Sequence, residues 1–248
     1  MPVRRHYLPG TACWLAYGAK DPVAAAAFYQ DLFGWQLITE PGGFGHQATI
    51  GDHPAASFAP TPGQPAWLVC LAGDCAAPPP GWRKRFGPVP LADIGRLLIA
   101  ADDYGASVGI FAGAQGDGIV VAHEPGASYG AWRLGPAATA SVDSAVAGCG
   151  GVVTDRAETA GVVRLGLGSD EALWAVEDGG PPRWLPAFGA ERLADALAQV
   201  SATGGTIIKR YDNAAEVSDP LGGHFVLVQA DVSRPTQGPV QPPTVCVS

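Results

Sequence analysis

A tryptophan–leucine pair recurs three times along this chain in the same local setting. Each pair lies in a short apolar run, and an acidic residue follows seven positions after the tryptophan. The copies are Trp14-Leu15 before Asp21, Trp67-Leu68 before Asp74, and Trp184-Leu185 before Glu191. A pattern that returns in this way indicates repeated structural units.

A fourth, degenerate copy completes the series. Pro9-Gly10 before the first tryptophan reappears as Pro125-Gly126, which places Gly130 at the tryptophan position. Residues 146–153 also resemble residues 200–207, and this offset of 54 maps Gly130 onto Trp184. The sequence therefore predicts four units of roughly fifty residues, arranged as two pairs.

The first unit is predicted to be a strand, a helix and three further strands. The opening strand is expected at residues 11–18. Asp21-Pro22 supply an N-cap and a proline at the first helical position, and Gly34 ends the helix. The later strands are expected at residues 35–39, 45–50 and 55–59, which are separated by glycine-containing turns.

The second unit keeps the strands but lacks the helix. A strand is expected at residues 66–72, but Pro78-Pro79-Pro80 follow it and remove backbone donors that a helix needs. Further strands are expected near Val89, at 96–100 and at 107–111. The missing helix leaves Trp82-Arg83-Lys84-Arg85 on a flexible segment near the rim, which suits a lid, a dimer contact or drift in a half without function.

The last two units repeat the pattern after an interdomain linker at residues 113–118. The third begins near Ser128 and has a weak helix at 137–147. The fourth has a strand at 183–188, a helix at 191–201 and strands at 206–210 and 224–229. Asp219-Pro220-Leu221-Gly222 form a tight turn before the closing strand.

Two of these motifs resemble the vicinal oxygen chelate superfamily, which contains glyoxalase I, extradiol dioxygenases and bleomycin-resistance proteins. They are Lys20-Asp21-Pro22 leading into residues 28–35, and the turn at 219–222. The long chain is similar to the tandem, two-domain glyoxalase-like proteins of actinobacterial type. The resemblance implies an α+β fold with glyoxalase-like domains at about 1–115 and 119–232, and the Pro- and Gln-rich residues 233–248 form a tail.

In this superfamily two units form a cup whose floor can hold a divalent metal. The resemblance implies His or Gln ligands on the first strands and Glu on a last strand. In this sequence the first-strand positions are Trp14, Trp67, Trp184 and Gly130, and the Glu positions fall near Gly109 and Val226. None of these binds a metal, so no metal or other cofactor is expected. A displaced set of His46, His53, Glu177 and His224 is the alternative.

Aromatic side chains take the place of those ligands. The expected ligand-binding residues are Trp14, Trp67, Trp132, Trp184 and Phe188, which would line a cup for an apolar or aromatic small molecule. The tryptophans could equally plug the cup as a packed core. Two other function classes stay open: an enzyme of secondary metabolism (a lyase, isomerase, cyclase or ring-cleaving oxygenase), and an interaction domain with filled cups.

The composition argues against two classes of binding partner, nucleic acids and membranes. The formal net charge is -8 and no basic run is longer than residues 83–85, which argues against a nucleic-acid partner. No apolar stretch is long enough to cross a bilayer, so no membrane partner is expected. The five scattered cysteines indicate a reducing, cytoplasmic setting. A homodimer is possible, although a chain with four units can complete its cups alone.

Overall fold

A computed structural model describes residues 6–40, 45–91, 94–113, 118, 121–168 and 171–230. The N-terminal half contains β1 (Ala12–Ala19), α1 (Pro22–Phe33), β2 (Gln36–Thr39), β3 (His46–Ile50), β4 (His53–Pro60), β5 (Ala66–Ala72), β6 (Arg83–Leu91), β7 (Gly95–Ala101) and β8 (Ser107–Gly113). The C-terminal half contains β9 (Ser128–Leu134), α2 (Ala138–Gly148), β10 (Asp155–Thr159), β11 (Val162–Gly166), β12 (Ala172–Val176), β13 (Arg183–Ala190), α3 (Leu193–Ala202), β14 (Thr206–Arg210), β15 (Ala214–Ser218) and β16 (His224–Gln229). The tail and most of the linker lie outside the described residues.

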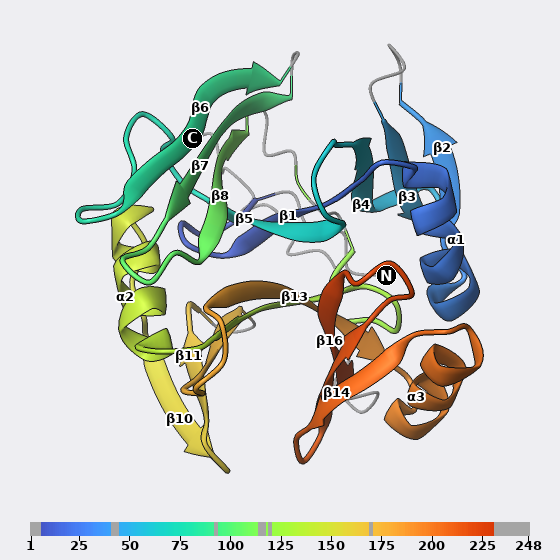
Figure 1. The fold of residues 1–248 in the computed structure, drawn as a ribbon. Helices are drawn as coiled ribbons and strands as arrows, with labels where there is room; N and C mark the ends of the chain where they lie inside the picture. Colours follow the sequence, from blue (N-terminus) through green and yellow to red (C-terminus); the bar gives the residue numbers. More distant parts are fainter. Residues whose placement is uncertain are drawn as a thin grey trace, which may run out of the picture.

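Each half of the chain forms one curved sheet of eight strands. The strand orders are β2-β3-β4-β1-β5-β8-β7-β6 and β10-β11-β12-β9-β13-β16-β15-β14. In both sheets the first strands of the two units pair antiparallel at the centre, and each closing strand runs parallel to its own first strand. The sheets lie back to back and open in opposite directions (Figure 1). The predicted α+β fold of four units in two pairs is confirmed.

Local sequence signals determine the first helix. Asp21 is the N-cap of α1, and its carboxylate accepts hydrogen bonds from the backbone N–H groups of Val23 and Ala24. Gly34 ends the helix in the left-handed region at φ 69°. No helix of the described chain is long and apolar enough to span a bilayer.

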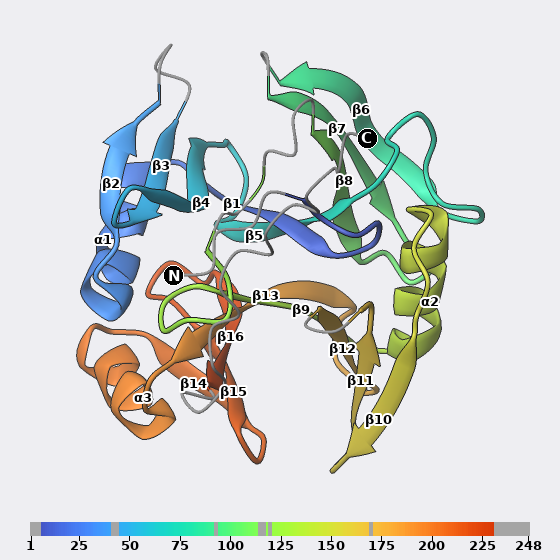
Figure 2. The same cartoon turned by 180° about the vertical axis from the view of Figure 1, so that it is seen from behind.

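The second unit has no helix between β5 and β6, as its proline run predicts. The loop that replaces the helix packs against α2 of the other half, where Trp82 Nε1 donates to Ser144 Oγ at 3.0 Å. Trp82 is buried, and Arg83 begins the edge strand β6. The prediction that residues 82–85 form a flexible segment is therefore wrong, because pairing with β7 and this interdomain contact order them. Figure 2 shows α2 on one flank of the molecule and α1 with α3 on the other.

The convex faces of the two sheets share a core rich in aromatic rings. Trp67 of the N-terminal sheet lies 5.3 Å from Phe188 of the C-terminal sheet, measured between ring centroids. Tyr29 of α1 lies 5.2 Å from Trp67 and 5.4 Å from Phe225. The contacts with Phe188 and Phe225 cross between the halves and stabilise the back-to-back arrangement.

Two buried aspartates connect the two halves of the chain through equivalent hydrogen bonds. Asp219, in the turn before β16, accepts hydrogen bonds from the hydroxyls of Tyr17 at 2.6 Å and Tyr29 at 2.7 Å. Its other oxygen accepts from the backbone N–H groups of Leu221 and Gly223. We call Asp219, Tyr17 and Tyr29 the Asp219 cluster. Burial, followed by the interactions with Asp219, raises the pKa of both tyrosines.

The Asp102 cluster is the counterpart on the other flank. Asp102, in the turn before β8, accepts from Arg133 Nη2 of β9 at 2.7 Å and from Ser141 Oγ of α2 at 2.6 Å. Both members of the ion pair are almost fully buried. Tyr17 and Arg133 occupy equivalent places, since they pair across the strands with Trp67 and Trp184 respectively. In each case a closing-turn aspartate from one half is bonded to a first strand and helix of the other half.

Candidate ligand-binding site

The concave face of the N-terminal sheet is largely filled by its own side chains. Trp14, Phe111 and Tyr7 pack together with Cys13 and Cys70. Burial raises the pKa of the Cys70 thiol to about 12, so this thiol stays protonated at neutral pH. A cavity of about 210 Å³ remains beside Tyr7.

The concave face of the C-terminal sheet holds a larger cavity, of about 850 Å³. This volume lies within the range of cavities that bind small molecules. The rings of Trp132 and Trp174 lie nearly parallel at a centroid separation of 6.1 Å, and Tyr211 lies 5.1 Å from Trp132. Apolar residues extend this aromatic wall: Val162, Val176 and Val228.

Two polar groups in the aromatic wall are buried without a hydrogen-bond partner among the described residues. They are Trp132 Nε1 and the Tyr211 hydroxyl. Burial, followed by nearby Glu216, raises the pKa of Tyr211 to about 12, so the hydroxyl is protonated and can donate. A buried donor without an acceptor costs about 1–3 kcal/mol. A ligand oxygen reaching these groups would remove that cost.

Basic side chains line the same cavity although the chain as a whole is acidic. Lys209 lies over the Tyr211 ring with its Nζ 5.1 Å from the ring centroid. Arg210 and Arg164 also line the cavity, as do two acidic residues, Glu177 and Asp212. Glu177 accepts from the backbone N–H of Thr139, and Arg164 is paired with Asp155. Within the part of the chain that the structure describes, Lys209 has no carboxylate within salt-bridge distance, so its charge is available to a ligand.

The predicted site residues are divided between different parts of the molecule. Trp14 lies in the N-terminal cup and Trp132 in the C-terminal cup. Trp67, Trp184 and Phe188 belong to the core between the sheets. The prediction that all five side chains point into cups is wrong for these last three.

The reason is that the repeat alignment is out of register with the alternation of side chains by one residue. Trp14 pairs with Cys70 of β5, and both side chains reach the concave cluster. Trp67 pairs with Tyr17, three residues after Trp14, and therefore faces the opposite side. An alignment that counts from the helix-capping acid superposes Trp14 on Trp67, although the two positions lie on opposite faces of the sheet.

The floors of both cups do not fit the metal site that the resemblance implies. The concave face of the C-terminal sheet carries Trp132, Leu185, Ala187 and Val226 at its centre, none of which is a metal ligand. No group of three His, Cys, Asp or Glu residues in the described chain is arranged to hold a metal ion.

The displaced ligand set is also not assembled. His46 and His53 lie on β3 and β4 of the N-terminal sheet, whereas Glu177 and His224 belong to the C-terminal half. The alternative of a displaced metal site at these four residues is therefore wrong, because the described chain does not group them as metal ligands.

One polar network lies on the C-terminal sheet beside the aromatic wall. Glu216 of β15 is almost fully buried and accepts two hydrogen bonds from Arg183, at 3.1 and 2.9 Å. His224 Nδ1 lies 3.0 Å from the same carboxylate. Burial alone would raise the pKa of Glu216, but the bonds from His224 and Arg183 outweigh it and lower the pKa below the ordinary value.

The network predicts a loss of stability in acid. Because the pKa of Glu216 is lower in the folded chain than in the unfolded chain, its contribution is complete above about pH 4.5 and disappears as the pH falls through the folded value. We expect urea unfolding between pH 7 and pH 3 to show a smaller pH dependence in Glu216→Gln than in the native chain. An identical dependence in both proteins would contradict this assignment.

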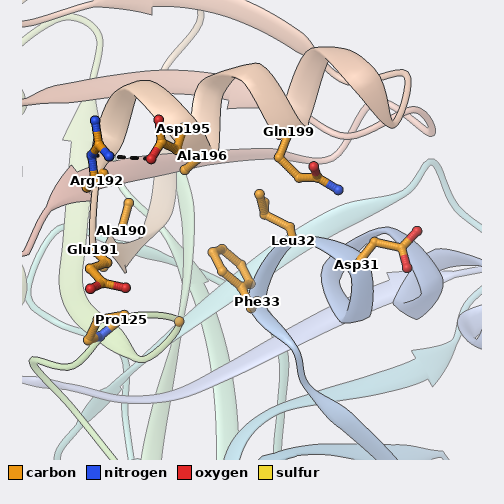
Figure 3. A pocket seen from close by; sticks show the side chains of 12 residues that line it. Asp31, Leu32, Phe33, Pro125, Ala190, Glu191, Arg192, Asp195, Ala196 and Gln199 are labelled. Carbon is orange, nitrogen blue, oxygen red and sulfur yellow. Dashed lines mark ion pairs between the residues drawn. The ribbon is translucent and has the colours of Figure 1, made fainter.

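A separate cleft of about 430 Å³ lies between α1 and α3. Leu32 and Phe33 of α1 face it from one side, and Arg192 and Asp195 form an exposed ion pair on the other (Figure 3). This cleft belongs to the junction of the two halves and to neither cup.

Several residues of the C-terminal cavity are not predicted by the sequence patterns: Trp174, Tyr211, Lys209 and Arg210. A signal for Trp174 existed, because the closing strand of a unit lies parallel to its first strand and Trp174 pairs directly with Trp132. Tyr211 follows β14, at the start of the turn into β15, and no repeat pattern predicts its direction.

Comparison with known proteins supports the architecture. No family model matches the chain. It is 26% identical over 256 residues to the Mycobacterium bovis protein CFP32, which carries the name of a glyoxylase, with 92% of this chain and 98% of that protein covered. It is 27% identical over 146 residues to the Streptomyces peucetius anthracycline biosynthesis protein DnrV, with 48% of this chain and 53% of DnrV covered.

Solved structures share the fold at low sequence identity. The Mn(II)-bound glyoxalase from Novosphingobium aromaticivorans superposes with a TM-score of 0.60 and 16% identity, covering 92% of this chain and 86% of the glyoxalase. The 2,3-dioxygenase LapB from Pseudomonas sp. KL28 superposes with a TM-score of 0.61 and 10% identity, covering 91% and 93%. Both matches span the two halves of the chain.

Proposed function

We propose that this chain, which belongs to the vicinal oxygen chelate superfamily, binds a flat aromatic small molecule in its C-terminal cup without a metal ion. The observation that carries the proposal is the cavity of about 850 Å³ walled by Trp132, Trp174 and Tyr211. Aromatic rings favour a flat, apolar ligand body. The name of the relative DnrV, an anthracycline biosynthesis protein, supports a polycyclic aromatic ligand.

The polar groups of the cavity refine the ligand class. Lys209 and Arg210 favour an anionic substituent, and the buried donors of Trp132 and Tyr211 favour an oxygen acceptor on the ring system. We therefore expect a planar compound with carbonyl or phenolate oxygens and a negative charge at one end.

Binding should depend on Trp174. With anthraquinone-2-carboxylate as the probe, we expect saturable quenching of tryptophan fluorescence, and Trp174→Ala should weaken binding by about tenfold or more, because stacking on the indole is lost. Lys209→Gln should lower the affinity for anthraquinone-2-carboxylate by a few-fold and leave the affinity for uncharged anthraquinone unchanged.

Trp14→Ala is the matched control, since it makes the same change in the other cup. It should leave the affinity within about twofold of the native value. A loss of binding in Trp14→Ala with no effect of Trp174→Ala would move the site to the N-terminal cup and contradict the proposal.

A second candidate is an enzyme: a glyoxalase-like lyase, an isomerase or a ring-cleaving oxygenase of secondary metabolism. The observation that favours it is the Glu216–His224 pair, in which a buried carboxylate orients an imidazole that could accept a proton. Recovery of a chemically altered ligand after incubation with the purified chain would support this function, and unchanged ligand would support binding alone.

A further inference from the structure

Another cavity, of about 400 Å³, lies where the ends of the two sheets meet. We call it the seam cavity. It is lined by residues of both halves, among them Trp67 at the start of β5, Trp184 at the start of β13 and Ile208 of β14. His224, Glu216 and Arg183 form its polar side. It shares no lining residue with the C-terminal cup cavity described above.

Two tryptophans at equivalent positions form the apolar wall of the seam cavity, but their N–H groups differ. Trp67 Nε1 donates to the Tyr29 hydroxyl at 2.8 Å. Trp184 Nε1 is buried and has no acceptor in the described part of the chain. On the flank of Trp184, the helix residue of the aspartate cluster is Ser141, whose short side chain is bonded to Asp102.

His224 provides an oriented acceptor in the same cavity. Its Nδ1 faces the Glu216 carboxylate at 3.0 Å, so Nδ1 carries the proton and donates to the carboxylate. The neutral ring then has its lone pair on Nε2, which has no hydrogen-bond partner among the residues described. Arg183 is bonded to the same carboxylate and keeps it anionic, which stabilises this tautomer.

We propose that the seam cavity is a second ligand site, which takes a small aromatic alcohol or phenol. The ring lies against Trp67 and Trp184, and the hydroxyl donates to His224 Nε2. Glu216 is a positioning residue, because it fixes the tautomer of His224 without touching the ligand.

The indole N–H resonances give a direct test in the full chain, which has seven tryptophans. In ¹⁵N-tryptophan-labelled protein, 2-naphthol should shift the Trp184 indole resonance in a saturable way, and Trp184→Phe assigns that resonance. The matched probe 2-methoxynaphthalene lacks the donor and should bind about tenfold more weakly, the effect of one hydrogen bond. An unmoved Trp184 resonance at saturating 2-naphthol would overturn the proposal.

Two variants separate recognition from folding. His224→Phe should lower the affinity for 2-naphthol by about tenfold and change the affinity for 2-methoxynaphthalene by less than about twofold. An equal loss for both probes would contradict the role of His224. Ile208→Asp, at a half-exposed position of the cavity, should lower the affinity for both probes without unfolding the chain. Ile38→Asp, at a half-exposed position of β2, is the control and should leave both affinities unchanged. Unchanged binding in Ile208→Asp would also count against the site.

Binding in the seam cavity does not depend on binding in the C-terminal cup, and the two can be tested separately. Trp174→Ala should weaken the binding of anthraquinone-2-carboxylate by about tenfold or more and leave the 2-naphthol shift at Trp184 intact. If anthraquinone-2-carboxylate fails to bind while the Trp184 shift persists, only the cup proposal fails. If the shift at Trp184 disappears in Trp174→Ala, the two cavities are one site and the inference is wrong.

Discussion

Replacing Asp219 with alanine is expected to lower the free energy of unfolding by about 3–5 kcal/mol. The carboxylate is almost fully buried and accepts from two tyrosine hydroxyls and two backbone N–H groups. Alanine would leave these donors without a partner in the interdomain core. Urea denaturation followed by tryptophan fluorescence measures the difference.

The control for Asp219→Ala is Asp212→Ala, since Asp212 is an exposed aspartate of the same half. Surface changes of this kind alter stability by about 0.5 kcal/mol or less. Tyr29→Phe removes one hydroxyl and should cost about 1–2 kcal/mol, because Tyr17 still bonds to Asp219. Equal stabilities for Asp219→Ala and Asp212→Ala would show that the Asp219 cluster does not connect the halves as described.

Replacing Arg133 with methionine should have an effect of similar size, about 3–5 kcal/mol, because it leaves Asp102 as a buried charge without its cation. The double variant Asp102→Ala/Arg133→Met removes both charges. It should be more stable than the sum of the single losses predicts, by at least about 1 kcal/mol. Strict additivity of the two single changes would contradict direct pairing of these residues.

Both clusters lie at the positions where a closing turn of one half meets a first strand of the other. The residue types differ, since Tyr17 and Tyr29 on one flank correspond to Arg133 and Ser141 on the other. The same aspartate position therefore bonds to neutral hydroxyls in one case and to a cation and a hydroxyl in the other. The interdomain geometry is retained while its chemistry changes.

Much of the fold could be predicted because its signals are local. Asp21-Pro22 and Gly34 determine the ends of α1, and three consecutive prolines exclude a helix from the second unit. The repeat then orders the strands into two sheets. What the repeat could not predict was the face of each tryptophan, because a one-residue difference in register places Trp14 and Trp67 on opposite faces of the sheet.

The C-terminal cavity depends on longer-range geometry. Trp132 was predicted to face the cup and does so, but its partners come from a closing strand and a turn. Trp174 becomes its neighbour through parallel pairing, and Tyr211 reaches it across the curved sheet. Such contacts follow from the curvature of the sheet, which residue patterns along one strand do not encode.

Metal-free binding of an aromatic ligand in the C-terminal cup is tested most directly by calorimetric titration of the full chain dialysed against EDTA. Anthraquinone-2-carboxylate should bind with the same affinity before and after addition of Mn²⁺ or Zn²⁺, and the affinity should fall by about tenfold or more in Trp174→Ala. Binding that appears only after a divalent metal is added, or that is unaffected by Trp174→Ala, would contradict the account.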